Sequence, residues 1–141
     1  MKRTATMVVI LLAAASLASM LPGMVSAADA PKDRVVVMYF HRTQRCPTCL
    51  KMGSYTEEAV KNGFAKETKE GRVSLHFIDF QNEQNAAFTK AYGISGPTLI
   101  VAKASGDKVA EYRNLKDMWA KVRDKDAFLE YVETNVKSYL K

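Results

Sequence analysis

The sequence predicts one α/β domain in which a four-stranded mixed sheet carries helices on both faces. Two observations support this fold class. Strand-like and helical patterns alternate in the order β-α-β-α-β-β-α, and the only two cysteines, Cys46 and Cys49, lie between the first strand pattern and the first helical pattern. Helical crossovers follow the first two strands, so the first three should pair in parallel or mixed fashion, and a closing hairpin adds an antiparallel edge.

Residues 1–27 are typical of a cleavable export signal. Its parts are a basic start, a short apolar run and a helix break followed by small residues, at 2–3, 7–21 and 22–28. The run is short for a membrane span, and small residues suit signal peptidase. We therefore expect an exported protein, periplasmic or otherwise extracytoplasmic, with a short lead at 28–33 and the folded domain at 34–141. An uncleaved anchor is the alternative.

Charge and hydropathy together argue against two classes of partner. The chain has 21 basic and 15 acidic residues, a net charge of +6, and the signs are interspersed without a long block of either. This pattern indicates a solvated surface and not a nucleic-acid footprint. No second long apolar run follows the signal, so we expect no stable membrane insertion after cleavage.

The first half of the domain should form a buried strand and a long helix. Consecutive apolar residues within 34–41 predict a central strand. Pro47 suits the first helical position, where its missing N–H costs nothing. The helix weakens at Gly63 and should kink or restart through 64–69, with Gly71 as its C-terminal cap.

The second half supplies the remaining elements. We expect a second strand, a short helix capped by Asn82, a third strand, a hairpin turn, a fourth strand and a last helix, at 73–80, 82–93, 99–102, 105–107, 109–113 and 124–141. The last helix has an apolar stripe at Phe128, Val132, Val136 and Leu140. Trp119 lies in the polar connection before it and should pack against that helix; exposure as a recognition residue is the alternative.

The cysteine spacing indicates reactivity. A disulfide across two residues constrains the unfolded chain very little, so a structural staple is disfavoured. The backbone N–H groups at a helix N-terminus stabilise a thiolate, and a thiolate is the attacking species in disulfide exchange. Cys46 should therefore have a lowered pKa, with Arg45 and His41 as the residues that tune it and Arg42 as a further candidate.

Three motifs together resemble the thioredoxin-like superfamily over residues 33–141. They are Cys46-Pro47-Thr48-Cys49 after the first strand, Phe77-Ile78-Asp79-Phe80-Gln81-Asn82, and Tyr92-Gly93-Ile94-Ser95-Gly96-Pro97-Thr98-Leu99. The resemblance implies a thioredoxin-like fold in which Cys46 is the nucleophile and Cys49 the resolving cysteine. It also implies that Pro97 is a cis-proline beside the dithiol, where its backbone neighbours bind a peptide. Gly96, lacking a side chain, should leave open space there for substrate.

The sequence departs from thioredoxins proper near the dithiol. Arg45 replaces the tryptophan that precedes the first cysteine, and the first strand lacks the buried aspartate that helps to deprotonate the second. Both departures argue against efficient protein reduction of the thioredoxin kind and favour an oxidising or isomerising role.

These observations predict an exported thiol–disulfide oxidoreductase without an organic cofactor. Its partners would be thiols and disulfides of other exported proteins and a redox partner that recycles it. The alternative is a non-enzymatic metallochaperone or thiol-binding module that holds Cu(I) on the same dithiol. A zinc site needs four ligands, and beyond the cysteines only His41 and His76 remain, so no zinc site is expected; His76 should be structural.

Overall fold

The computed structural model describes residues 32–141, so the predicted signal at 1–27 and most of the lead at 28–33 lie outside the described residues. The elements are β1 (Asp33–His41), α1 (Pro47–Gly63), α2 (Ala65–Lys69), β2 (Val73–Asp79), a 3-10 turn (Glu83–Asn85), α3 (Ala86–Ala91), β3 (Thr98–Ser105), β4 (Lys108–Asn114), α4 (Met118–Lys121) and α5 (Lys125–Tyr139). The predicted order is confirmed, with α2 as the restarted end of α1 and α4 as an additional short helix.

The four strands form one mixed sheet in the order β2-β1-β3-β4. β1 pairs in parallel with β2 and antiparallel with β3, and β4 pairs antiparallel with β3. Phe40, at the end of β1, faces Ile78 on one side and Thr98 on the other. The chain therefore leaves β1 and enters β3 at the same edge of the sheet, which brings residues 42–46 and 94–97 to one end of the molecule.

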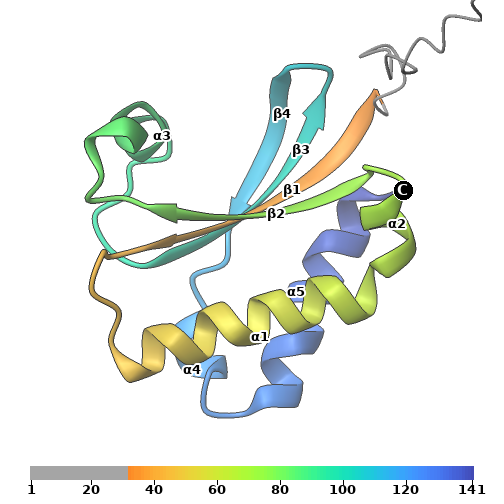
Figure 1. Ribbon diagram of the computed structural model, residues 1–141. Helices are drawn as coiled ribbons and strands as arrows, with labels where there is room; N and C mark the ends of the chain where they lie inside the picture. The colour runs from red at the N-terminus through yellow and green to blue at the C-terminus, as the bar shows by residue number, and fades with distance from the viewer. Residues whose placement is uncertain (1–31) are drawn as a thin grey trace, which may run out of the picture.

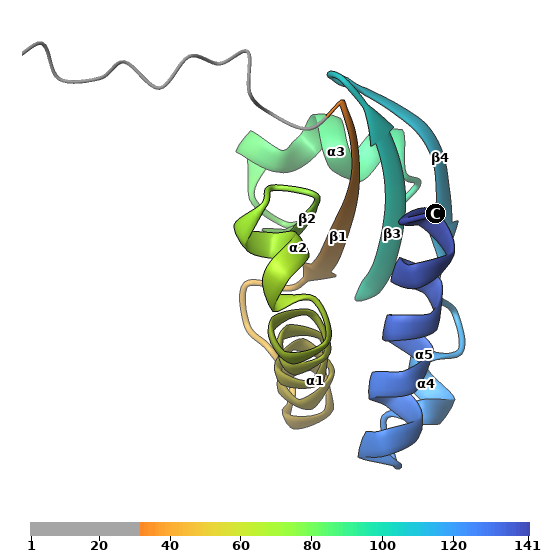
Figure 2. The same ribbon diagram turned by 90° about the vertical axis from the view of Figure 1, so that its right-hand side faces the viewer.

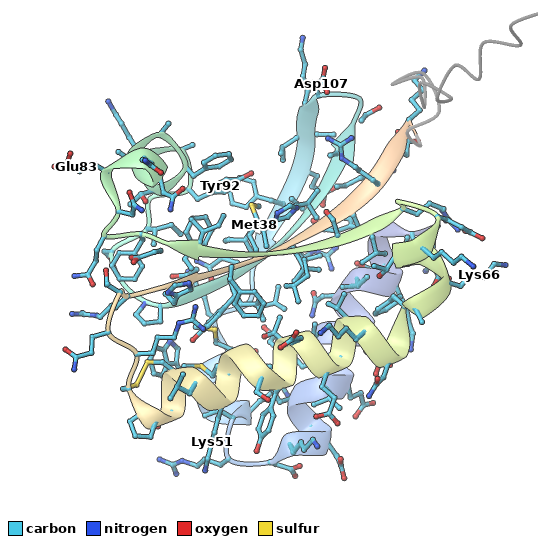
Figure 3. All side chains as sticks on the ribbon, viewed as in Figure 1. Met38, Lys51, Lys66, Glu83, Tyr92 and Asp107 are labelled. Carbon is cyan, nitrogen blue, oxygen red and sulfur yellow. A yellow bond between two sulfur atoms is a disulfide. The ribbon has the colours of Figure 1, made fainter. Side chains whose placement is uncertain are left out.

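Alternation along β1 divides the core between the two faces of the sheet. Val35, Val37 and Tyr39 are buried on the face that α1 and α5 cover. Met38 and Phe40 are buried on the opposite face, where the residues that flank α3 complete a second, smaller core. Figures 1 and 2 show α3 across the sheet from α1 and α5, and Figure 3 labels Met38 and Tyr92 on that second side. Helices on both faces are thus confirmed.

The last helix supplies a row of buried apolar residues to the larger core. Phe128, Val132 and Val136 on α5 are fully buried, as the predicted stripe requires. Leu140 is only half-buried, because α5 ends at Tyr139 and Tyr139 packs into the core in its place. α5 lies against α1, and together they close one face of β1.

Several boundaries differ from the prediction. The segment expected as one helix at 82–93 is a 3-10 turn followed by the six-residue α3, which buries no residue. Gly71 follows α2 with a positive φ of 72°, so it does take the left-handed conformation expected of a helix cap. No helix within residues 32–141 has the length and apolar character needed to cross a bilayer.

Candidate functional site: a disulfide at the start of α1

The two cysteines are joined in a disulfide at the first turn of α1, with their Cα atoms 5.0 Å apart. Cys46 is exposed, whereas Cys49 is 5% exposed. A reagent approaching from solvent therefore meets the sulfur of Cys46 and not that of Cys49. The division into an attacking and a resolving cysteine stays a prediction.

The sulfur of Cys46 occupies the N-cap position of α1. Cys46 has extended backbone angles, and its Sγ accepts a hydrogen bond from the N–H of Cys49 at 3.1 Å. Its carbonyl oxygen accepts the next helical hydrogen bond, from the N–H of Leu50 at 2.9 Å. Pro47 follows at the first helical position, as predicted. In the reduced protein a thiolate at Cys46 would face the same N–H and the positive end of the helix dipole.

The strand order and the position of this disulfide identify the architecture. A central β1, parallel to β2 and antiparallel to β3, runs into a C-x-x-C pair that opens the helix covering that strand. The fold is thioredoxin-like. This agrees with the resemblance of the sequence motifs.

Solved structures similar to this one include three thioredoxins. They are chloroplastic thioredoxin z (19% identity, TM-score 0.40, 67% of this chain and 80% of that one), a variant thioredoxin of Halobacterium salinarum (22%, 0.39, 72% and 74%) and the germline-specific thioredoxin Deadhead of Drosophila melanogaster (22%, 0.39, 62% and 80%). No protein-family profile and no curated protein matches the sequence. The fold assignment therefore depends on the strand order and the place of the disulfide.

Arg45 is held next to the disulfide by His41 and Phe77. Its Nη2 donates to His41 Nε2 at 2.7 Å, and its guanidinium carbon lies 5.6 Å from the centre of the Phe77 ring. Because arginine can only donate, His41 Nε2 must accept, and His41 Nδ1 then carries the proton that is donated to the Arg42 carbonyl at 2.9 Å. His41 thus positions Arg45. Tuning of Cys46 by these two residues stays a prediction.

Tyr39 is the buried polar group behind the dithiol. It is fully buried, and its hydroxyl donates to the carbonyl oxygen of Cys49 at 2.8 Å. Burial raises the pKa of Tyr39 to about 12, although the nearby Arg45 charge opposes the rise. The phenol therefore stays protonated at neutral pH and acts as a hydrogen-bond donor. It cannot replace the carboxylate that thioredoxins proper keep in this strand.

Asp79, at the end of β2, fixes the loop that leads into the site. Its carboxylate accepts hydrogen bonds from the Thr43 hydroxyl at 2.7 Å and from the Gln81 N–H at 2.9 Å. These donors hold the pKa of Asp79 below its usual value. Gln81 Oε1 in turn accepts from the Thr43 N–H at 3.1 Å. This anchor was not among the predicted site residues; the local signal for it is the Asp-x-Gln sequence that begins at the last residue of β2.

Gly96 and Pro97 lie at the same edge of the sheet, just before β3. A Cβ added at Gly96 would meet no atom within 4 Å, so the predicted open space is present. The expectation of a cis-proline is wrong: no peptide bond within the described residues is cis, and Pro97 follows Gly96 through the trans bond that is the default for proline as well. The turn is closed by the Thr98 hydroxyl, which donates to the Gly96 carbonyl at 2.8 Å. The role of Gly96 and Pro97 in substrate binding stays a prediction.

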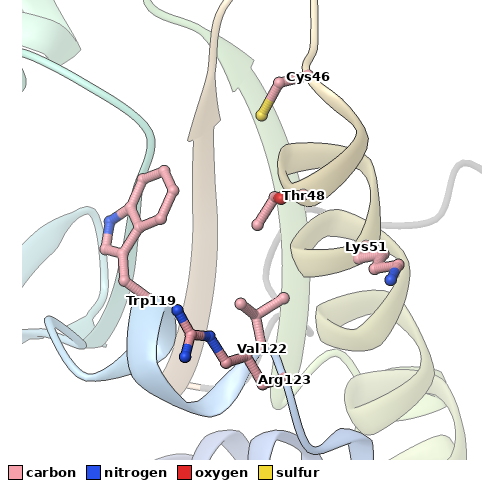
Figure 4. Close-up of a pocket in the computed structure, with 6 residues that line it drawn as sticks. All are labelled: Cys46, Thr48, Lys51, Trp119, Val122 and Arg123. Carbon is pink, nitrogen blue, oxygen red and sulfur yellow. The ribbon is translucent and has the colours of Figure 1, made fainter.

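Two open clefts share Cys46 as a wall. The first, of about 380 Å³, lies between the start of α1 and the region of α4 and is lined by Cys46, Thr48, Lys51, Trp119, Val122 and Arg123 (Figure 4). The second, of about 460 Å³, is lined by Arg42, Gln44, Arg45, Cys46 and Gln81. An extended ligand could therefore pass along both sides of the exposed sulfur.

The expectation that Trp119 packs against the last helix is wrong. Trp119 lies on α4, is 47% exposed and faces the cleft opposite Cys46 (Figure 4). The buried positions of this segment are Leu115, Met118 and Val122, spaced three and four residues apart, and they leave position 119 on the outer side of the turn. That spacing was the signal for α4, which the sequence analysis read as a polar connection.

The histidines do not extend the dithiol into a larger ligand set. Both ring nitrogens of His41 are engaged, and His76 is exposed on β2 with its Nε2 3.2 Å from Ser74 Oγ. Across residues 32–141 no group of three or more Cys, His, Asp or Glu side chains could hold a metal ion. Binding of Cu(I) to the two sulfurs alone stays untested.

Proposed function

We propose that the protein is an exported thiol–disulfide oxidoreductase that exchanges electrons with the disulfides of other exported proteins through Cys46 and Cys49. The observation that carries the proposal is the asymmetry of the disulfide. One sulfur is exposed at the N-cap of α1 and receives a backbone N–H, and the other is buried one turn along the helix.

The reaction would proceed through a mixed disulfide. In the reduced protein the Cys46 thiolate attacks one sulfur of a partner disulfide; that S–S bond breaks, and the displaced partner thiolate takes a proton from water. Cys49 then loses its proton to solvent and attacks Cys46 Sγ, which releases the second partner thiol and leaves the Cys46–Cys49 disulfide. Two electrons pass to the partner. The reverse sequence oxidises a partner dithiol.

The surroundings of Cys49 favour the oxidising direction. Its neighbour in β1 is the neutral phenol of Tyr39, which donates to the Cys49 backbone and is not a base at neutral pH. Deprotonation of Cys49 is therefore unassisted from this strand, so resolution of a mixed disulfide should be slow. Stabilisation of the Cys46 thiolate works in the same direction, because it stabilises the reduced state and makes the disulfide a stronger oxidant.

The proposal predicts a low pKa for the Cys46 thiol. We expect the alkylation rate of the Cys49→Ala variant by iodoacetamide to show a midpoint well below 8, compared with roughly 8.5 for a free cysteine. The physical cause is the helix N-terminus together with the guanidinium of Arg45, and each unit of depression corresponds to about 1.4 kcal/mol in favour of the thiolate. The measurement is the second-order alkylation rate between pH 4 and 10.

Two further variants complete this titration. Cys49 alone, in Cys46→Ala, should react slowly because its sulfur is buried. Arg45→Gln in the Cys49→Ala background should raise the midpoint, because it removes the guanidinium charge beside Cys46. A midpoint near that of free cysteine in the Cys49→Ala variant, with Arg45 retained, would contradict the proposed activation of Cys46.

Export is supported by the composition of residues 1–27 and by the persistence of exposed disulfides in oxidising compartments. We expect the protein recovered from its native compartment to begin at Ala28 or Asp29, as read by mass spectrometry of the intact chain. A mass that includes Met1 would remove the cleaved-signal part of the proposal and leave the dithiol chemistry unaffected.

A further inference from the structure

The surroundings of Cys46 are positively charged on both sides. Lys51 and Arg123 line the cleft toward α4, and Arg42 and Arg45 line the cleft toward β2. Among the described residues, neither cleft is lined by a carboxylate. Four cationic side chains therefore lie around the one sulfur that a substrate can reach.

None of these four cations pairs with a carboxylate in the described part of the chain. The four ion pairs of residues 32–141 join lysines to glutamates elsewhere, at Lys61–Glu57, Lys66–Glu70, Lys125–Glu58 and Lys137–Glu133. Arg45 donates a hydrogen bond to His41. Within residues 32–141, Arg42, Lys51 and Arg123 take part in no ion pair. Their charges are thus available to a ligand.

Two acidic residues adjoin cleft-lining residues, and both accept hydrogen bonds from backbone N–H groups. Asp79 accepts hydrogen bonds from Thr43 and Gln81, and Asp124, next to Arg123, caps α5 by accepting from the Ala127 N–H at 3.1 Å. These carboxylates hold their own backbone segments. Neither of them lines the two clefts, and Glu57, which lines a neighbouring pocket with Arg45, is paired with Lys61.

The cleft toward α4 also has an apolar wall. Trp119 presents its half-exposed indole opposite Cys46, and Val122 lies below it (Figure 4). Arg123 follows Trp119 by four residues, so a cation and an aromatic surface lie close together on one side of the cleft. Such a pair binds the backbone and a charged side chain of an extended peptide at once.

We infer that these clefts bind an acidic polypeptide segment, with Asp or Glu on both sides of the cysteine that exchanges with Cys46. The inference rests on the proposed function, because a ligand centred on Cys46 must bring a thiol or disulfide to it. A polypeptide suits the site better than a small anionic thiol, because the two clefts extend in both directions from the sulfur. Lys51 and Arg123 hold carboxylates on one side and Arg42 holds one on the other.

The test uses three disulfide peptides of equal length with the reduced protein. Each carries one cysteine blocked as a mixed disulfide with 2-mercaptoethanol, flanked by Glu, Gln or Lys. We expect the second-order rate to fall in the order Glu, Gln, Lys, with the Glu peptide about 5- to 30-fold faster than the Gln peptide at low ionic strength. The advantage should shrink above about 0.5 M salt, since the Debye length then falls to a few ångströms.

The variants assign the effect to the cleft. Lys51→Gln combined with Arg123→Gln should lower the ratio of the Glu-peptide rate to the Gln-peptide rate about 3- to 10-fold. The effect is of this size because each of the two exposed charges contributes only modestly. Lys108→Gln removes one charge at the β3–β4 hairpin, beside Asp107 and at the other end of the molecule from Lys51 (Figure 3), and should leave the ratio unchanged. Because a ratio is compared, a general change in Cys46 reactivity cancels.

The outcomes separate this inference from the proposed function. Equal rates on the three peptides overturn the inference and leave disulfide exchange standing. A Glu preference that persists in the double variant overturns the assignment to this cleft. Glutathione disulfide reacting faster than the Glu peptide overturns the polypeptide as occupant. No exchange with any peptide or with glutathione disulfide overturns the proposed function itself.

Discussion

Replacing Cys46 with alanine is expected to abolish the proposed disulfide exchange, with a loss of roughly three orders of magnitude or more in rate, as removal of a nucleophile does in enzymes. Cys46 carries the exposed sulfur, and Cys49 is 5% exposed, so Cys49 cannot replace it as the attacking group. Reduction of insulin and exchange with hydroxyethyl disulfide measure the loss. For the reverse direction, the rate at which the oxidised protein refolds a reduced disulfide-containing protein is compared between the wild type and the variant.

Replacing Cys49 with alanine should have a different result. The first attack by Cys46 is preserved, but the internal release step is lost, so a mixed disulfide with the partner accumulates and can be isolated under non-reducing conditions. Thr68→Ala, on α2 away from the site, is the control and should retain full turnover. If Cys49→Ala captures no partner through Cys46, and the reduced wild type binds one Cu(I) tightly without exchange activity, the copper-binding alternative is favoured instead.

Replacing Phe128 with alanine is expected to cause the largest loss of stability, about 3–5 kcal/mol in the free energy of unfolding. Phe128 is fully buried on α5, and its ring packs edge-on against Tyr55 of α1 with centroids 5.8 Å apart. The substitution leaves a cavity between the two helices that cover β1. Denaturant unfolding of the oxidised protein, with the disulfide held constant, gives the change.

Phe88→Ala is the matched control for this substitution. Phe88 lies on α3 and is 51% exposed, so the same change of side chain should alter stability by no more than about 0.5 kcal/mol. Because Phe128 lines neither cleft around Cys46, exchange activity of Phe128→Ala should survive below its unfolding transition. A cost for Phe128→Ala as small as that for Phe88→Ala would contradict the packing of α5 on α1.

The element order and the location of the dithiol were predictable from the sequence, because both depend on local patterns. Consecutive apolar residues identified β1, helical spacing identified α5, and Pro47 after Cys46 marked the start of α1. The restart of the first helix also followed from one local feature, Gly63, with α2 beginning at Ala65. Each of these signals lies within a few residues of the structure it specifies.

The contacts around the dithiol were not predictable in the same way, because they join residues far apart in the chain. Thr43 meets Asp79 across 36 positions, and Trp119 faces Cys46 only because α4 turns its other side into the core. Propensity rules say nothing about which side of a four-residue helix will be buried. Sequence spacing likewise could not distinguish a cis from a trans bond before Pro97.

The sequence by itself determined that this chain folds as an α/β domain and presents a C-x-x-C pair at a helix start, because hydrophobic periodicity and capping act locally. Only the tertiary structure decided which sulfur is exposed, that the Tyr39 hydroxyl donates to the Cys49 backbone, and that cations without a carboxylate partner in residues 32–141 surround Cys46. Those properties depend on how helices and strands pack, and packing is set by contacts between residues that are distant along the chain.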